Sequence, residues 1–185
     1  MEIQKIETKK IPCKHEGYLL PFSNAPVIIS QGYEGPYSHI ATKRGSLFYD
    51  DRFSIDFALQ LNTSVSASKS GIVFGVISSN SDYYQGYNIS KGLSTPTNWI
   101  ILEHLDNTFT LYSHLAKDRI KVKIHEMVNK GDIIAFTGLS GWIGKTPHLH
   151  FEAYALPPGC ARASFPVAFS NYSESLYHKD LFKLH

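Results

Sequence analysis

Short apolar and β-branched runs, separated by turn residues, follow one another along most of this chain. Seven runs have the length and composition of strands: 25–30, 53–59, 71–77, 99–104, 108–114, 132–136 and 148–154. No ten-residue segment shows a convincing period of 3.6 residues, so helices are not predicted. The pattern predicts an all-β fold, an antiparallel β-sandwich or half-open barrel with long loops that form a groove.

Two polar stretches interrupt the predicted strands. Residues 31–51 are rich in Gly, Tyr and charge, and residues 78–98 carry Tyr83, Tyr84 and Tyr87 in a polar background. Loops of this length in a compact domain often form binding walls, and plain surface insertion is the open alternative. We expect the two loops to line the groove and the three tyrosines to contact whatever binds there.

The composition fits one domain and argues against two classes of partner. With 185 residues, 43% of them hydrophobic, the chain is long enough for a single core. We expect that core at about 20–156, an irregular N-terminal arm at 1–18 and a C-terminal segment at 157–185 that wraps the sandwich. A net charge of +2 without a basic stripe argues against nucleic acid, and no run approaches the roughly 20 apolar residues of a membrane helix.

The two ends of the chain leave alternatives open. Residues 1–10 are charged and lack the apolar core of a signal peptide, so either the protein stays inside its cell or a leader is absent from this sequence. Cys13 and Cys160 lie near opposite ends. One disulfide that pins the N-terminal arm and two separate buried thiols are both compatible with that spacing.

The run Pro147-His-Leu-His-Phe-Glu152 carries the clearest chemical signal. In a strand, residues two apart point to the same face, with Cα atoms roughly 6.5–7 Å apart. His148 and His150 therefore share a face, and Leu149 and Phe151 share the other. This arrangement suits one imidazole that binds a metal ion and a second that contacts what the metal activates, although structural histidines explain many such pairs.

Two other polar residues stand on predicted strand faces. Alternation in 53–59 gives one apolar face and places Asp56 on the other, between two small residues, where a cation would compensate an acid in a strand. Alternation in 108–114 places Tyr112 and His114 on one side. Taken alone, Asp56 is equally a solvated carboxylate and His114 a half-buried structural histidine.

Together these segments resemble the lysostaphin/LytM-type peptidases, the M23 metallopeptidases, over about residues 20–156. The motifs that carry the resemblance are 112–115 (Tyr-Ser-His-Leu), 138–141 (Gly-x-x-Gly) and 147–152, with similar segments at 38–39, 55–57, 99–104 and 128–132. The resemblance implies a Zn²⁺ ion held by His39, Asp56 and His150, with a fourth position open to water. It also implies that His114 and His148 stay unligated beside the metal and perform the proton transfers, since no H-E-x-x-H glutamate is present.

One ligand departs from the commonest pattern of that family, which has a histidine four residues before the aspartate. Arg52 occupies that position and cannot bind zinc, because it keeps its proton. A family variant has Ser-His further upstream, and His39, 17 residues before Asp56, resembles that variant. His104 is the reserve candidate. Glu152 either orients the His150 ring or is solvated beyond the site.

The implied function is hydrolysis of peptide cross-links or bridges in bacterial peptidoglycan, by a periplasmic or secreted protein. The resemblance does not select between a glycine bridge and a D-alanyl cross-link. The main alternative is a catalytically inactive LytM-like domain that binds cell wall or regulates a partner hydrolase. A non-enzymatic carrier or carbohydrate-binding domain is a third reading, which leaves the histidines unexplained.

Overall fold

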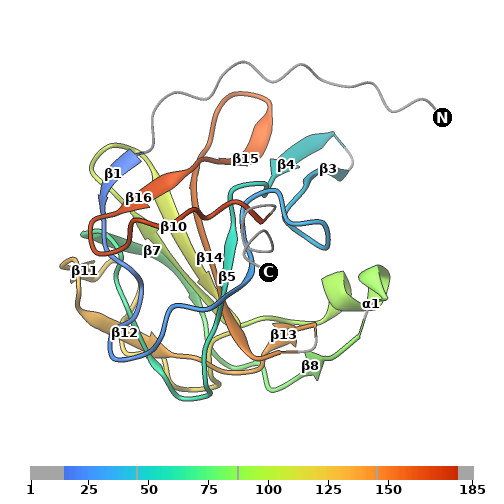
Figure 1. The fold of residues 1–185 in the computed structure, drawn as a ribbon, viewed down its shortest axis with the longest axis horizontal. Helices are drawn as coiled ribbons and strands as arrows, with labels where there is room; N and C mark the ends of the chain where they lie inside the picture. The colour runs from blue at the N-terminus through green and yellow to red at the C-terminus, as the bar shows by residue number, and fades with distance from the viewer. Residues whose placement is uncertain (1–14, 45, 87, 145, 179–185) are drawn as a thin grey trace.

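A computed structural model describes residues 15–44, 46–86, 88–144 and 146–178. Within these residues the chain forms strands and one short helix (Figure 1). The elements are β1 (His15–Tyr18), β2 (Ile29–Gln31), β3 (Ala41–Arg44), β4 (Leu47–Asp50), β5 (Ile55–Ala58), β6 (Ser64–Ser66), β7 (Gly71–Ile77), β8 (Tyr83–Tyr84), α1 (Ile89–Ser94), β9 (Trp99–Glu103), β10 (Phe109–Ser113), β11 (Met127–Val128), β12 (Ile133–Phe136), β13 (Gly141–Trp142), β14 (His148–Ala155), β15 (Cys160–Ser164) and β16 (Val167–Phe169).

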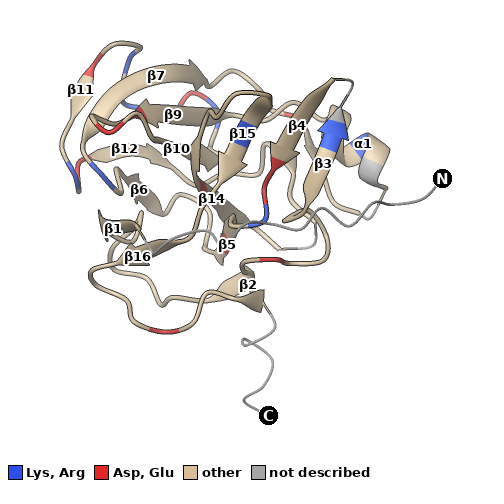
Figure 2. Ribbon diagram, turned by 90° about the horizontal axis from the view of Figure 1, so that it is seen from above, with Lys and Arg blue, Asp and Glu red and all other residues tan. Residues whose placement is uncertain are grey.

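One large sheet organises the molecule. Its strand order is β11-β7-β9-β10-β14-β15-β4-β3, and β5 pairs with β14 and carries β2 on its other edge. Most neighbours are antiparallel, whereas β15 and β4 run parallel. The short sheets β12–β6 and β1–β16 cover one face of the large sheet, which gives a layered fold (Figure 2). The all-β prediction is confirmed, and within the described residues the sheet does not close into a barrel.

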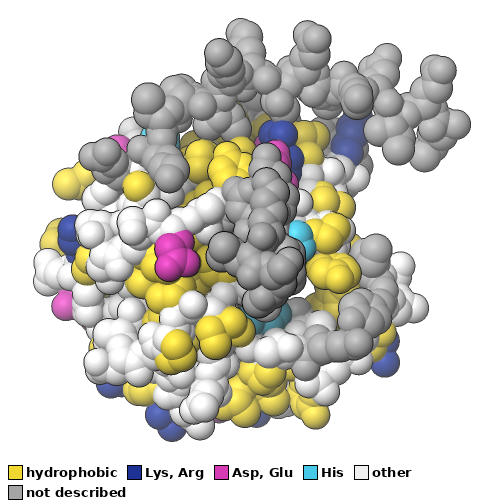
Figure 3. Space-filling view, viewed as in Figure 1, with side chains coloured by type: hydrophobic (Ala, Val, Ile, Leu, Met, Phe, Trp, Pro, Cys, Tyr) yellow, Lys and Arg dark blue, Asp and Glu magenta, His cyan; other side chains and the backbone are white. Residues whose placement is uncertain are grey.

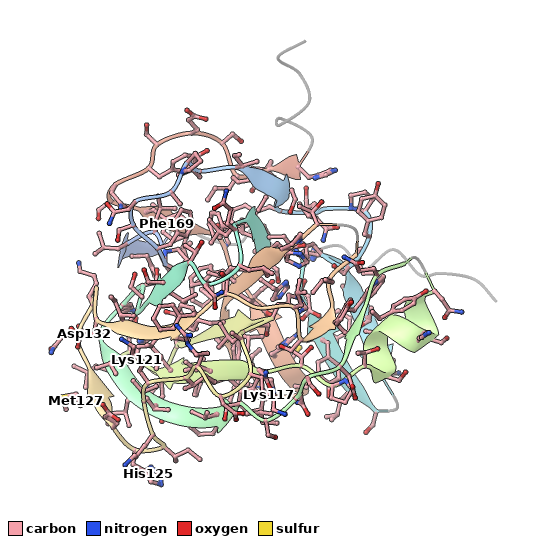
Figure 4. The ribbon with its side chains drawn as sticks, turned by 90° about the horizontal axis from the view of Figure 1, so that it is seen from below. Lys117, Lys121, His125, Met127, Asp132 and Phe169 are labelled. Atoms are coloured by element: carbon pink, nitrogen blue, oxygen red, sulfur yellow. The ribbon has the colours of Figure 1, made fainter. Side chains whose placement is uncertain are left out.

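The core lies between these layers and explains why the central strands alternate. Ile55 and Phe57 of β5, and Leu149 and Phe151 of β14, are all at most 1% exposed and belong to one hydrophobic cluster. Phe169 of β16 packs its ring 5.7 Å from that of Phe151 (Figure 4). Each such side chain contributes roughly 1.5–3 kcal/mol on burial, which fixes the faces of both strands.

Strand register brings polar residues into one row on the opposite face. His150 of β14 stands directly opposite Asp56 of β5 and also opposite Ser113 of β10. Asp56 in turn lies next to Gln31 of β2. Residues directly opposite in neighbouring strands share a face, so the row lies on the side of the sheet away from the main core.

Both segments predicted as loops contain regular structure, and that part of the prediction is wrong. Residues 31–51 include the hairpin β3–β4, which joins the large sheet through β15, and residues 78–98 include β8 and α1. Within the described part of the C-terminal segment, β15 joins the large sheet and β16 pairs with β1. The arm predicted at 1–18 is not wholly irregular, because residues 15–18 form β1. Cys13 lies outside the described residues, so its pairing with Cys160 stays open.

No helix in the described part of the chain is both long and apolar enough to cross a bilayer; α1 has six residues. Acidic and basic residues are interleaved around the described ribbon rather than gathered on one side (Figure 2). His125 is exposed near Met127, away from α1 (Figure 4).

Candidate metal centre

Three predicted ligands converge at one end of the polar row. The Nδ1 atom of His150 lies 2.8 Å from Oδ1 of Asp56, and the Nε2 atom of His39 lies 3.2 Å from the same oxygen. One ligand atom from each residue lies within 4.8 Å of the other two, a spacing that suits a single metal ion. Two of the residues face each other on adjacent strands, and His39 arrives from the connection between β2 and β3.

His39 provides the clearest test of whether the site fits a metal. Its side chain is fully buried, and its Nδ1 is 2.9 Å from the carbonyl oxygen of Gly32, which fixes Nδ1 as the donor. Nε2 is then the acceptor, and it is buried without a hydrogen-bond partner among the described residues. Leaving such an atom unsatisfied costs about 1–3 kcal/mol, and a cation bound there would remove that cost. The donor set therefore fits zinc.

Asp56 is held as an ionised carboxylate. Burial acting alone would raise the pKa of its carboxyl group, but His39, His148 and the hydrogen bond from His150 together hold that pKa well below its usual range. Its second oxygen, Oδ2, accepts a hydrogen bond of 2.9 Å from Nε2 of Gln31. The carboxylate is thus in the protonation state that binds a metal, with Oδ1 directed at the histidines.

Behind His150 lies a buried carboxylate. Oε2 of Glu152 is 3.9 Å from Nε2 of His150, and Glu152 is fully buried, so the reading of Glu152 as solvated is wrong. Nε of Arg162, on β15, lies 3.4 Å from Glu152 and 2.7 Å from Asp51. Burial lowers the pKa of His150, while Asp56 and Glu152 raise it, with a net rise to about 9. A metal ion must therefore displace a proton from this ring.

His114 and His148 form a second pair beside the three ligands. Their ring centroids are 4.6 Å apart, and Nε2 of His148 lies 3.7 Å from Oδ1 of Asp56. Each Nδ1 lies 2.8 Å from a backbone carbonyl, that of Ser140 for His114 and that of Thr146 for His148. Burial, followed by the neighbouring His148 and His150, lowers the pKa of His114 to about 3. His114 is therefore a neutral imidazole near neutral pH.

Strict alternation gave the wrong neighbour for His114. Tyr112 does not share its side: Tyr112 is fully buried in the core, its ring packs against Phe151, and its hydroxyl accepts from the amide of Ser68. Strand β10 ends at Ser113, and His114 adopts a positive φ of 64°. This left-handed conformation reverses the direction of the side chain and turns the imidazole towards the site.

A cavity of about 200 Å³ opens in front of these residues. Figure 3 shows histidine side chains at the hollow right of centre, with hydrophobic side chains beside it. The cavity is lined by Ser30, Gln31, Tyr37, Ser38, Asp56, His114, Trp142, Ile143, Gly144, Thr146, His148 and His150. Gln31 and Tyr37 fall in the segment 31–51 that we expected to line the groove, although neither was singled out there. Trp142, next to the glycine motif, was not indicated by the sequence.

Two of the predicted substrate-binding tyrosines, Tyr83 and Tyr84, lie elsewhere. Tyr83 borders a second, open hollow, and Tyr84 lies beneath Lys91, whose Nζ is 4.8 Å from the ring centroid. Neither residue lines the cavity in front of the ligands. Strand β8 instead pairs with β13 and so supports Trp142, which does line it. Tyr87 lies outside the described residues, and a substrate contact by the tyrosines stays a prediction.

His104, the reserve ligand, is placed away from the three ligands. Its Nδ1 lies 2.9 Å from the carbonyl oxygen of Ser70, and its Nε2 lies 3.1 Å from Oγ1 of Thr110. Both ring nitrogens are therefore engaged with protein partners. These contacts give His104 a structural role, in which it links Ser70 and Thr110.

Fold and site together define a class: a β-protein with a His–Asp–His centre open to a cavity and two further histidines beside it. The family model of Peptidase family M23 matches residues 51–159, and the chain belongs to this family. The matched region includes Asp56, His114, His148 and His150. His39 and Arg162 lie outside it.

Individual relatives agree with the family assignment. A stretch of 75 residues, 40% of this chain, is 37% identical to the peptidoglycan DD-endopeptidase ShyB of Vibrio cholerae serotype O1, and covers 17% of that protein. The structure resembles a zinc-containing peptidase from Vibrio cholerae (26% identity, TM-score 0.52, 80% of this chain and 38% of that one). It also resembles the catalytic domain of a mutant of the prophage-encoded M23 protein EnpA from Enterococcus faecalis (24% identity, TM-score 0.51, 78% of this chain and 93% of that one), a likeness of fold.

The chain thus corresponds to less than half of the two Vibrio relatives, at 17% and 38% of their lengths. Activities and substrates of those whole proteins pass to this chain only as proposals.

Proposed function

We propose that this chain is a zinc-dependent endopeptidase that hydrolyses peptide bonds in bacterial peptidoglycan. The observation that carries the proposal is the convergence of His39, Asp56 and His150 around a buried imidazole nitrogen that has no hydrogen-bond partner among the described residues. Two relatives support it by name: one is a peptidoglycan DD-endopeptidase, and the other is a zinc-containing peptidase. Because peptidoglycan lies outside the cytoplasmic membrane, the proposal includes a periplasmic or secreted location.

The geometry of the site supports two roles, metal binding and proton transfer, for two sets of residues. His39, Asp56 and His150 would hold zinc, and three protein ligands are the number found in catalytic rather than structural zinc sites. Bound zinc supplies a Lewis acid and lowers the pKa of its water towards ~7. His114 and His148 are each oriented by a backbone carbonyl at Nδ1, which leaves Nε2 available for a proton. One ring, neutral, would accept a proton from water at Nε2, and the other would have to carry a proton on both nitrogens to donate a hydrogen bond to the developing oxyanion.

The cavity walls would hold an extended peptide next to these groups. Tyr37 is 60% exposed at the rim, and Trp142 forms part of the wall on the side of β13. Aromatic walls bind peptide backbone and side chains without demanding one sequence. A glycine bridge and a D-alanyl cross-link are both candidate scissile sites.

Metal content and activity of matched variants test the proposal. Wild type purified without chelator should contain zinc and solubilise purified peptidoglycan, and chelation should abolish the activity. Asp56→Ala should lose zinc and activity together. His114→Ala should keep zinc but lose about 10²–10⁴-fold in rate, the usual contribution of a general acid or base.

His125→Ala is the matched control, since it removes an exposed histidine far from the cavity and should change neither readout. Zinc retained by Asp56→Ala would refute the ligand assignment. Wild type that binds zinc and peptidoglycan but releases no fragments would instead identify an inactive, wall-binding domain.

A further inference from the structure

Gln31 is a buried amide in direct contact with the proposed metal centre. It ends β2, is 5% exposed and stands opposite Asp56 across the β2–β5 pairing. Its Nε2 donates to Oδ2 of Asp56 at 2.9 Å. Oδ1, the other carboxylate oxygen, is the one that lies near His39 and His150. The amide thus occupies one oxygen of the carboxylate and leaves the other directed at the two histidines.

The same side chain also holds the loop that ends at His39. Oε1 of Gln31 accepts hydrogen bonds from the backbone amides of Tyr37 (3.0 Å) and Ser38 (3.3 Å). Nε2 donates a second hydrogen bond, of 2.9 Å, to Oγ of Ser38. This orientation of the amide is chemically determined, because its oxygen faces two N–H donors and its nitrogen faces a carboxylate and a hydroxyl.

A second contact shows how closely the loop encloses this side chain. Gly35 lies so near Gln31 that a methyl group on its Cα would collide with Cγ of Gln31. The loop segment 35–39 therefore packs closely against the Gln31 side chain. Backbone groups at the start of the loop add to this packing, since Gly35 N donates to the carbonyl of Gly32.

The need for such a link follows from the spacing of the ligands. The β5–β14 register alone places Asp56 opposite His150. His39 lies 17 positions before Asp56, and the hairpin β3–β4 lies between them, so no strand pairing sets the position of His39 relative to the carboxylate. Gln31 bridges this gap through bonds to both sides.

We propose that Gln31 is a positioning residue of the metal centre, one that limits Asp56 to a single ligand oxygen and fixes the loop that presents His39. The inference rests on the proposed function and deepens it. Residues that orient metal ligands through hydrogen bonds affect metal affinity without touching the ion, typically by 10–100-fold.

The test measures metal binding directly. Gln31→Met keeps the approximate volume and removes every hydrogen bond of the amide. Competition with a chromophoric chelator should show zinc bound about 10–100-fold more weakly than by wild type. Zinc is spectroscopically silent, so Co²⁺ is bound in its place, and the visible spectrum should change because the freed Oδ2 can join the coordination. Gln60→Met, at an exposed glutamine after β5, is the matched control and should bind like wild type.

Gly35→Ala is an independent second variant that pushes on Gln31 without altering it, and it should shift the zinc affinity and the cobalt spectrum in the same direction. Circular dichroism and thermal melts of the metal-free proteins identify variants that fold. A purely structural role would lower the melting temperature and leave the cobalt spectrum of the folded variants unchanged, which would overturn the inference. Zinc affinity within about twofold of wild type in both variants would overturn it as well. Absence of zinc binding by wild type would instead overturn the proposed function, and this inference with it.

Discussion

Replacing Arg162 by methionine tests how the buried negative charge of Glu152, next to His150, is stabilised. Nε of Arg162 lies 3.4 Å from Oε1 of Glu152, which is fully buried and has no hydrogen bond to either oxygen among the described residues. Removing the cation takes the guanidinium away from both Glu152 and Asp51, and breaking a buried ion pair in this way costs about 3–5 kcal/mol. Since the Arg162 side chain is 26% exposed, water offsets part of the loss, and we expect the lower end, about 3 kcal/mol. At roughly 2–4 °C per kcal/mol for a chain of this size, the melting temperature should fall by roughly 6–12 °C.

Urea unfolding of metal-free protein, in the presence of a chelator, measures this cost without a contribution from zinc. Lys69→Met is the control, because Lys69 pairs at 2.6 Å with Asp106, whose side chain is 48% exposed. Exposed pairs of this kind contribute at most about 1 kcal/mol. Adding Glu152→Gln to Arg162→Met should recover part of the lost stability, since it removes the unpaired charge. A loss no larger than that of the Lys69 variant would refute the reasoning.

Two further predictions concern the supporting structure. Burial lowers the pKa of His104 from 6.5, against the opposing effect of the Ser70 carbonyl, so the unfolded chain binds a proton first as the pH falls below that value. The free energy of unfolding should therefore decrease as the pH falls from about 7 to 5, and it should decrease less in His104→Gln. Urea unfolding at several pH values measures this, and an equal dependence on pH in the two proteins would contradict it. Gly141 has a φ of +84°, and a methyl group there would collide with Thr97, so Gly141→Ala should cost more stability than Gly131→Ala, where φ is +94° but the space is open. Thermal melts should show about 1 kcal/mol for strain alone at Gly131 and a clearly larger loss at Gly141.

The local features of the fold were predictable from sequence because they depend on the alternation of side chains along a strand, which has a period of two residues. The apolar faces of 53–59 and 148–154, and the shared face of His148 and His150, follow from alternation alone, and burial agrees with them. The same rule failed at His114, where a single positive φ reverses the side chain. Nothing in a His-Leu dipeptide marks that conformation in advance, because histidine adopts it only when the surrounding structure imposes it.

Features that depend on distant partners were not predictable. Strand β4 is short and mixed in composition, and besides its hairpin partner β3 it pairs with β15, more than 100 residues later. Gln31 gave no signal for the same reason, since its role depends on the register that places it next to Asp56. His39 was identified through a family resemblance and not from its local pattern. The structure now brings it next to Asp56, and its role as a ligand remains a proposal.

The hairpin β3–β4 occupies the stretch of chain between the first proposed ligand and the second. One end of that stretch is fastened at residues 37–39 by Gln31 and the other at Asp56 by β14, so residues inserted between β3 and β4 would leave both anchor points where they are. In Figure 1 the hairpin and α1 both lie to the right of β5 and β14, the hairpin above and α1 below. The length of this hairpin can therefore change without moving the three proposed ligands.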